Sequence, residues 1–174
     1  INWKPFYATW KVEETNATQL YKDAESLLDE LERDVTCGIK ARVGILPAYR
    51  EGEAVVVSGE RIEMLRQQKK TESNVSLSLC DYIAPKNDFV GVFAVTVGRQ
   101  IHDLILQAQE RDDDYRAMLM QTVADRLVEA ATEYIHKRVR IELWGYAIDE
   151  VENTTNLLRQ YYQGIRPAVG YPSL

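Results

Sequence analysis

One long periodic segment constrains the fold of this chain more than any other feature. From Asp113 to about Leu143, apolar residues return every three or four positions, which predicts a single long helix. Acidic residues occupy its first turn, where they favour a helix because that end carries partial positive charge. The apolar set consists of Tyr115, Met118, Leu119, Val123, Leu127, Ala131, Tyr134, Ile135 and Val139.

Shorter segments with helix or strand patterns flank this long helix. Spacings of three and four predict an amphipathic helix from Ala17 to about Asp34, and further helices over Gln100–Glu110 and roughly Glu150–Tyr162. Strands are predicted at Arg42–Tyr49, Ala54–Ser58, Arg61–Arg66, Val75–Leu79 and Phe89–Val97, the third and fourth on weaker alternation. A helix, then antiparallel strands, then helices is the order of an α+β fold, not of repeated βαβ units.

Composition narrows the class of function. The 174 residues suffice for one domain with its own core, and 45% of them are hydrophobic. The net charge of −6 argues against a nucleic-acid surface, which needs clustered Lys and Arg. The one basic cluster, Arg66–Lys70, is interpreted as a solvated loop. No apolar run is long enough to span a membrane and no secretion signal is present, so a cytoplasmic protein without a membrane partner is expected.

The C-terminal tail contains the clearest candidate for ligand binding. Two prolines and two glycines within Gly164–Pro172 exclude a helix and predict an ordered loop. The Arg166 guanidinium can grip a carboxylate with two hydrogen bonds, Gly170 lets a ligand approach the backbone, and Tyr171 offers an aromatic face. The alternative is a structural, proline-rich extension.

The polar residues of the long helix suggest a second candidate. Asp125, Glu129 and Glu133 lie four apart and share a face, and Glu133-x-x-His136 matches half of a di-iron motif. A complete metal site needs a second such motif, and the only other histidine is His102. A solvated face in which Arg126 pairs with a glutamate is therefore the favoured interpretation, and no metal is expected. One of these carboxylates remains available for the ammonium group of a ligand.

The usual enzyme signatures do not occur in the sequence. There is no glycine-rich nucleotide loop, no nucleophile elbow and no zinc-protease motif. The absence of a nucleophile with an adjacent base points to a binding domain whose ligand brings its own reactivity.

Eight sequence blocks, in order along the whole chain, resemble one known family. They are Trp3-x-Pro5-Phe6-x-x-Thr9-Trp10, Val43-Gly44-x-x-Pro47-Ala48-x-Arg50, Leu65–Gln68, Asp81–Lys86, Gly91-x-Phe93–Thr96, Ala124–Leu127-x-Glu129-Ala130, Trp144–Ala147 and Tyr162-Gln163-Gly164-Ile165-Arg166-Pro167-Ala168-x-Gly170-Tyr171-Pro172. Together they look like the S-adenosylmethionine-binding activation domain of cobalamin-dependent methionine synthase.

The resemblance implies both a fold and a role. The fold would be a twisted antiparallel sheet with surrounding helices. The domain would present the methyl group of S-adenosylmethionine to oxidised cobalamin, cob(II)alamin, held by a partner domain or subunit. Flavodoxin or a similar reductase would supply one electron, and the cobalamin would return to its active cycle.

The resemblance also assigns roles to individual residues. Arg166 would hold the ligand carboxylate, and Glu129, assisted by Asn2, would approach its ammonium group. The backbone around Ala168 and Gly170, with Tyr171, would line the rest of the pocket.

Two departures from the family pattern bear on these roles. Asn2 stands where the family has aspartate, so it can accept a hydrogen bond but cannot form an ion pair. The family also continues beyond the position of Leu174, so a domain truncated at its C-terminus is expected. A non-catalytic interaction domain that kept the fold and lost the ligand is the alternative function.

Overall fold

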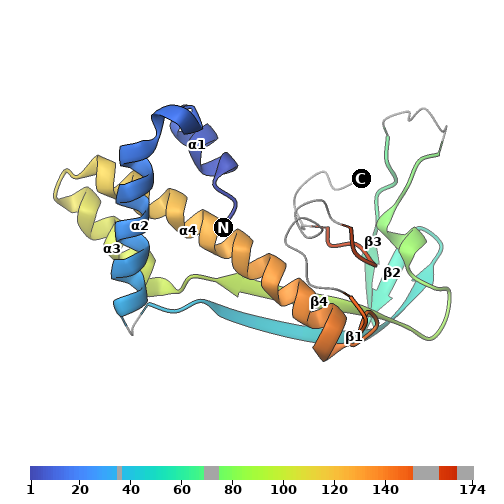
Figure 1. Cartoon of the computed structure of the whole chain (residues 1–174). Coiled ribbons are helices and arrows are strands. Elements are labelled where there is room, and N and C mark those ends of the chain that lie inside the picture. Colours follow the sequence, from blue (N-terminus) through green and yellow to red (C-terminus); the bar gives the residue numbers. More distant parts are fainter. Residues whose placement is uncertain (35–36, 69–74, 151–160, 168–174) are drawn as a thin grey trace. The chain divides into compact units, whose positions relative to one another are not determined.

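The computed structural model describes residues 1–34, 37–68, 75–150 and 161–167. Its helices are α1 (Lys4–Trp10), α2 (Thr18–Arg33), α3 (Arg99–Glu110) and α4 (Asp114–Arg138), with 3₁₀ turns at Glu14–Asn16 and Leu79–Tyr82 and a π-helical turn, η3, at Val139–Leu143. The strands are β1 (Lys40–Glu51), β2 (Ala54–Val57), β3 (Glu60–Glu63) and β4 (Asp88–Thr96) (Figure 1). The prediction of an α+β fold with an antiparallel sheet and one long helix is confirmed.

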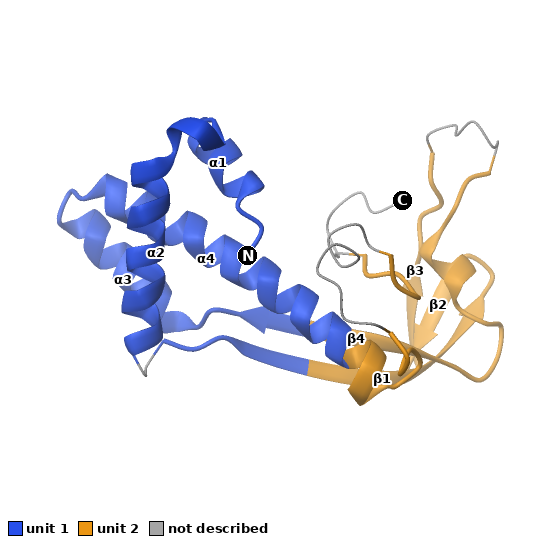
Figure 2. Cartoon of the chain, viewed as in Figure 1, with its two compact units in different colours: residues 1–42, 94–138 blue, residues 43–93, 139–174 orange. Residues whose placement is uncertain are grey.

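The chain divides into two compact units (Figure 2). Unit 1 contains residues 1–42 and 94–138, and unit 2 contains residues 43–93 and 139–174. No helix in the described part of the chain is both long and apolar enough to cross a membrane.

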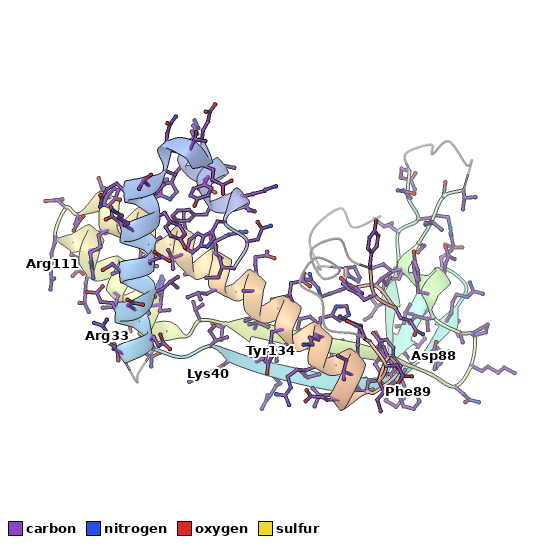
Figure 3. The ribbon with its side chains drawn as sticks, viewed as in Figure 1. Arg33, Lys40, Asp88, Phe89, Arg111 and Tyr134 are labelled. Atoms are coloured by element: carbon purple, nitrogen blue, oxygen red, sulfur yellow. The ribbon has the colours of Figure 1, made fainter. Side chains whose placement is uncertain are left out.

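Unit 1 is built from the apolar faces of its four helices. Both α1 and α2 contact α4, and α3 packs along it. The buried core residues are Phe6, Tyr7, Ala17, Ala24, Leu27, Leu31, Ile101, Ile105, Ala108, Ala117, Leu119, Met120, Val123 and Ala124. On α4 the buried strip differs from the predicted one, because Tyr115, Met118 and Tyr134 are exposed (Figure 3 labels Tyr134). The smaller Ala117 and Ala124 are buried, which lets neighbouring helices approach closely.

The aromatic opening segment forms a short helix that the sequence analysis did not predict. Pro5 lies in the first turn of α1, where its missing N–H group costs no helical hydrogen bond. The Trp3 ring meets the rings of Phe6 and Tyr21 edge-on at 5.2 Å, which joins α1 to α2. Aromatic burial against two other helices therefore stabilises a seven-residue helix that is too short to form alone.

The sheet has the strand order β3-β2-β1-β4. In the hairpin of β1 and β2, Ala48 lies opposite Val57 and Glu51 opposite Ala54. Ser58 and Gly59 both have positive φ, as a tight turn between β2 and β3 requires. In unit 2, Ala48, Val55 and Cys80 form a small buried core.

Two of the predicted elements differ from the structure, and a third lies mostly outside the described residues. Residues 75–78 are not a strand, because Ser78 caps the following 3₁₀ turn and the Asp81 carboxylate accepts a hydrogen bond from the Ser78 N–H group at 2.9 Å. Strand β3 ends at Glu63, three residues before the predicted boundary. Of the helix predicted at 150–162, residues 151–160 lie outside the described residues, and Glu150, Tyr161 and Tyr162 are not helical.

Arg66 begins the loop predicted at Arg66–Lys70, of which residues 69 and 70 lie outside the described residues, and its side chain is held by hydrogen bonds. Its guanidinium donates two hydrogen bonds to the Asp81 carboxylate, at 2.7 and 3.0 Å, and one to Glu53 at 2.9 Å. The two bonds from Arg66, with that from the Ser78 N–H group, hold the pKa of Asp81 low, at about 2. The network ties the segment after β3 to the turn before β4.

Candidate functional site

One face of α4 carries the candidate carboxylate Glu129. Trp10 of α1 donates a hydrogen bond from Nε1 to the Thr122 hydroxyl at 3.1 Å, so Thr122 marks the α4 face that meets α1. Glu129 follows Thr122 by seven residues, which is two helical turns, and therefore lies on the same face roughly 10 Å further along. Glu129 is exposed, so its carboxylate is accessible to a ligand.

Asn2 lies at the beginning of the same helix pair. Its side-chain oxygen accepts a hydrogen bond from the Lys4 N–H group at 3.3 Å, one of the free donors of the first turn of α1. The residue is exposed. Unit 1 thus contributes two accessible oxygen-bearing side chains, those of Asn2 and Glu129, both suited to an ammonium group.

Unit 2 contains Arg166, the residue proposed to bind the carboxylate of the ligand. Arg166 is half-buried, and its Nε atom is buried. The segment leading to it passes over Tyr146, since a Cβ atom placed on Gly164 would lie 2.9 Å from the tyrosine hydroxyl. Gly164 also has a φ of +91°, a backbone conformation that residues other than glycine rarely adopt. The remaining predicted site residues, Ala168, Gly170 and Tyr171, lie outside the described residues.

A buried arginine that the sequence analysis missed anchors the start of this segment. Arg140, in η3, is fully buried and donates two hydrogen bonds to the Glu150 carboxylate, at 2.6 Å from Nε and 2.5 Å from Nη2. The Tyr162 ring covers the same guanidinium at 4.1 Å. The only signal in the sequence was a lone arginine between Val139 and Ile141, and nothing in it identified Glu150 or Tyr162 as partners.

The electrostatics of this anchor keep the arginine charged. Burial by itself lowers the pKa of Arg140, but the hydrogen-bonded Glu150 carboxylate outweighs it and the net pKa is raised. Burial raises the pKa of the nearby Tyr146 hydroxyl, more than the Arg140 cation lowers it. Arg140 therefore stays a cation and Tyr146 a neutral phenol at ordinary pH.

The turn after η3 packs directly on the sheet. A Cβ atom on Gly91 of β4 would lie 3.4 Å from the Trp144 ring, and the Trp144 and Tyr146 rings meet edge-on at 5.4 Å. Gly164 thus packs against Tyr146, Tyr146 against Trp144, and Trp144 against Gly91 of β4. This chain of contacts places residues 161–167 within unit 2.

The half di-iron motif, Glu133-x-x-His136, is not part of a metal centre in the part of the chain that the structure describes. Within residues 1–34, 37–68, 75–150 and 161–167, no three His, Cys, Asp or Glu side chains gather closely enough to hold an ion. Of the two residues of the motif, His136 is buried, at 4% exposure, and Glu133 is half-buried. The expectation that the domain binds no metal remains a prediction.

The α+β domain thus has an exposed carboxylate, that of Glu129, on α4 of unit 1 and a half-buried guanidinium, that of Arg166, in unit 2. The structure is similar to that of a solved protein, "Crystal Structure of the MetH Reactivation Domain bound to AdoHcy", with a TM-score of 0.90 and 36% sequence identity. The match covers 99% of this chain and 61% of that one, so this chain spans less than two thirds of its length. Residues 1–174 match the family model "Vitamin B12 dependent methionine synthase, activation domain", and the chain belongs to that family.

Proposed function

We propose that this chain binds S-adenosylmethionine and presents its methyl group for the reactivation of cobalamin-dependent methionine synthase. One observation carries the proposal: a chain with the same fold and 36% identity is a reactivation domain bound to AdoHcy. AdoHcy, S-adenosylhomocysteine, is what S-adenosylmethionine becomes when it gives up its methyl group. A domain that holds the product in this way is suited to hold the methyl donor too.

The described residues fit the charges of such a ligand. Its amino-acid end carries a carboxylate and an ammonium group. Arg166 supplies a guanidinium fork for the carboxylate, and Glu129 supplies an exposed carboxylate for the ammonium, with the Asn2 amide oxygen as an additional acceptor. We assign Ala168, Gly170 and Tyr171 to the remainder of the pocket, on the strength of the sequence motif alone.

The chemistry needs few groups from this chain. When bound, S-adenosylmethionine supplies an electrophilic methyl group on its sulfonium sulfur. The side chains named above bind and orient the ligand, and no acid, base or nucleophile of this chain is needed. We further propose that a separate domain or subunit of methionine synthase holds the cobalamin, and that flavodoxin or a similar reductase provides the electron for cob(II)alamin.

Replacing Arg166 tests the assignment of the site. Arg166→Ala is expected to weaken S-adenosylmethionine binding by about 2 kcal/mol, because the ligand carboxylate loses two charge-assisted hydrogen bonds. Lysine at this position is expected to restore only part of the affinity, since an ammonium group cannot reproduce the planar fork. Isothermal titration calorimetry measures both values.

The matched control is Arg61→Ala, which removes an arginine from the exposed side of β3 in the same unit. It is expected to bind like the wild type. If Arg166→Ala also binds like the wild type, Arg166 is not a ligand contact. If the wild type itself fails to bind, the alternative of an interaction domain without ligand replaces the proposed function.

A further inference from the structure

The Arg140 side chain contacts two residues that are far apart in sequence. Glu150 precedes the segment 151–160, and Tyr162 follows it. The fully buried guanidinium makes a two-pronged hydrogen bond with the Glu150 carboxylate and lies 4.1 Å from the centre of the Tyr162 ring. One cation therefore contacts both Glu150 and Tyr162.

A buried ion pair is an unusual way to stabilise a protein. Removing two charges from water costs about as much as their attraction returns, so apolar residues of similar size commonly stabilise a core equally well. The exposed fraction is 0% for the Arg140 side chain and 17% for that of Glu150, so both are largely desolvated. Unlike apolar residues, the pair fixes the orientation of its partners, because the planar guanidinium fits one carboxylate orientation and one ring face.

The anchored segment leads directly to the proposed ligand contact. Arg166 lies four residues after Tyr162, and Gly164, between them, is held against Tyr146. The Arg140 backbone is also bonded to the residue that follows Tyr146, because the Arg140 carbonyl accepts a hydrogen bond from the Ala147 N–H group at 3.0 Å. The position of the segment before Arg166 thus depends on a stack of contacts that begins at Arg140.

We propose that Arg140, Glu150 and Tyr162 form a positioning cluster that holds the Arg166 segment in its ligand-binding arrangement. None of the three needs to touch the ligand. The predicted effect on affinity for S-adenosylmethionine rests on the proposed function. The structural part of the inference, the ordering of residues 161–166 by Arg140, stands independently of any ligand.

The test replaces Tyr162, which leaves the buried ion pair in place. Tyr162→Leu in the full chain removes the ring from the guanidinium and is expected to weaken S-adenosylmethionine binding about tenfold. Tyr162→Phe keeps the ring and is expected to bind within about twofold of the wild type. The matched control is Tyr161→Leu, the same change one residue earlier at a side chain that is 68% exposed, and it should bind like the wild type.

A double-mutant cycle separates positioning from direct contact. If Tyr162 acts through Arg166, Tyr162→Leu has little further effect once Arg166 is alanine, because the group being positioned is gone. Equal affinity of Tyr162→Leu and wild type, failure of phenylalanine to restore binding, or additive effects of the two substitutions would each overturn the inference.

Hydrogen exchange distinguishes this inference from the proposed function. Without ligand, the backbone amides of residues 161–166 are expected to exchange about tenfold faster in Tyr162→Leu than in the wild type or Tyr161→Leu. Unchanged exchange overturns the positioning role even if all variants bind ligand. If the wild type binds no S-adenosylmethionine but exchange accelerates as expected, the proposed function fails and the structural role of the cluster stands.

Discussion

Asn2 is the residue at which this chain departs most clearly from the chemistry expected of its site. Its amide oxygen accepts the Lys4 N–H group at 3.3 Å, which fixes the side chain at the N-terminal end of α1. An aspartate there would accept the same hydrogen bond and add a negative charge, which is favourable near the positive end of a helix. The substitution is therefore compatible with the local structure.

Asn2→Asp is expected to tighten S-adenosylmethionine binding several-fold, because a carboxylate can pair with the ligand ammonium as an ion. The gain should be larger at low salt, where screening is weaker. Calorimetry at two salt concentrations measures it. Asn16→Asp, which adds the same charge at another exposed position of unit 1, serves as the control for non-specific attraction. Unchanged or weaker affinity at both salt concentrations would mean that Asn2 does not occupy the acid's place in the pocket.

Gly164 allows a second comparison between single residues. Gly164 and Gly59 share the same φ of +91°, but a Cβ atom at Gly59 meets nothing within 4 Å, whereas at Gly164 it lies 2.9 Å from the Tyr146 hydroxyl. Both alanine variants incur the backbone strain, and only Gly164→Ala adds a clash. Gly164→Ala is therefore expected to be less stable than Gly59→Ala by about 1–3 kcal/mol, measured by urea denaturation.

Removing the Tyr146 hydroxyl should relieve this clash. In Gly164→Ala with Tyr146→Phe, the nearest ring atoms lie at 3.6 and 3.7 Å, which is ordinary contact, so most of the difference should disappear. A double variant as unstable as Gly164→Ala alone would show that the tail does not lie against Tyr146 in solution.

Among the structural elements, the connection between β3 and β4 is held by charge. The guanidinium of Arg66 forms two hydrogen bonds with Asp81, and Arg50 lies 3.6 Å from the same carboxylate. These contacts keep the pKa of Asp81 at about 2, below its value of about 3.9 in an unfolded chain. The stabilisation that they provide is complete above about pH 4 and is lost as the pH falls toward 2, since the unfolded state then binds the proton more readily.

Asp81→Asn should therefore flatten the acid limb of the stability profile. Urea denaturation between pH 5 and 2.5 is expected to show a steeper loss of stability for the wild type than for the variant. Asp112→Asn, at an exposed position in unit 1, controls for the loss of one negative charge. Parallel profiles for wild type and Asp81→Asn would contradict a role for this pair in holding the connection.

Helices and strands differ in how well the sequence predicts them, because different interactions stabilise them. The long helix was predictable because apolar residues recur along it every three or four positions, and β4 because its run of Val and Phe residues favours a strand. Helix α1 was missed because its stability comes from the rings of Trp3, Phe6 and Tyr21, two of them in α1's own segment and one on α2. The strand predicted at residues 75–79 is wrong, because side-chain capping at Ser78 outweighs a weak alternating pattern.

The site was predictable only in part, for a related reason. Arg166 and Glu129 could be proposed because their motifs are local in sequence. The Arg140 cluster could not, since Glu150 and Tyr162 reach the guanidinium from ten and twenty-two residues away. Burial and pairing over such separations leave no periodic signal.

At the scale of the whole molecule, the residues proposed to bind the ligand are distributed over the two compact units of the chain. Asn2 and Glu129 belong to unit 1 and Arg166 to unit 2, and β1, β4 and the junction of α4 with η3 connect the two along the chain. Because S-adenosylmethionine is proposed to bind the folded chain only, we expect ligand binding to raise the thermal stability of the chain.

Equilibrium dialysis with methyl-labelled S-adenosylmethionine tests the central claim most directly. The expected result is saturable binding to a single class of site, displaced by S-adenosylhomocysteine and not by ATP, which shares the adenosine but lacks the amino-acid end. Folded protein that shows no saturable binding, or binding that ATP displaces as well as S-adenosylhomocysteine does, would contradict the assignment of this chain as a domain that binds S-adenosylmethionine.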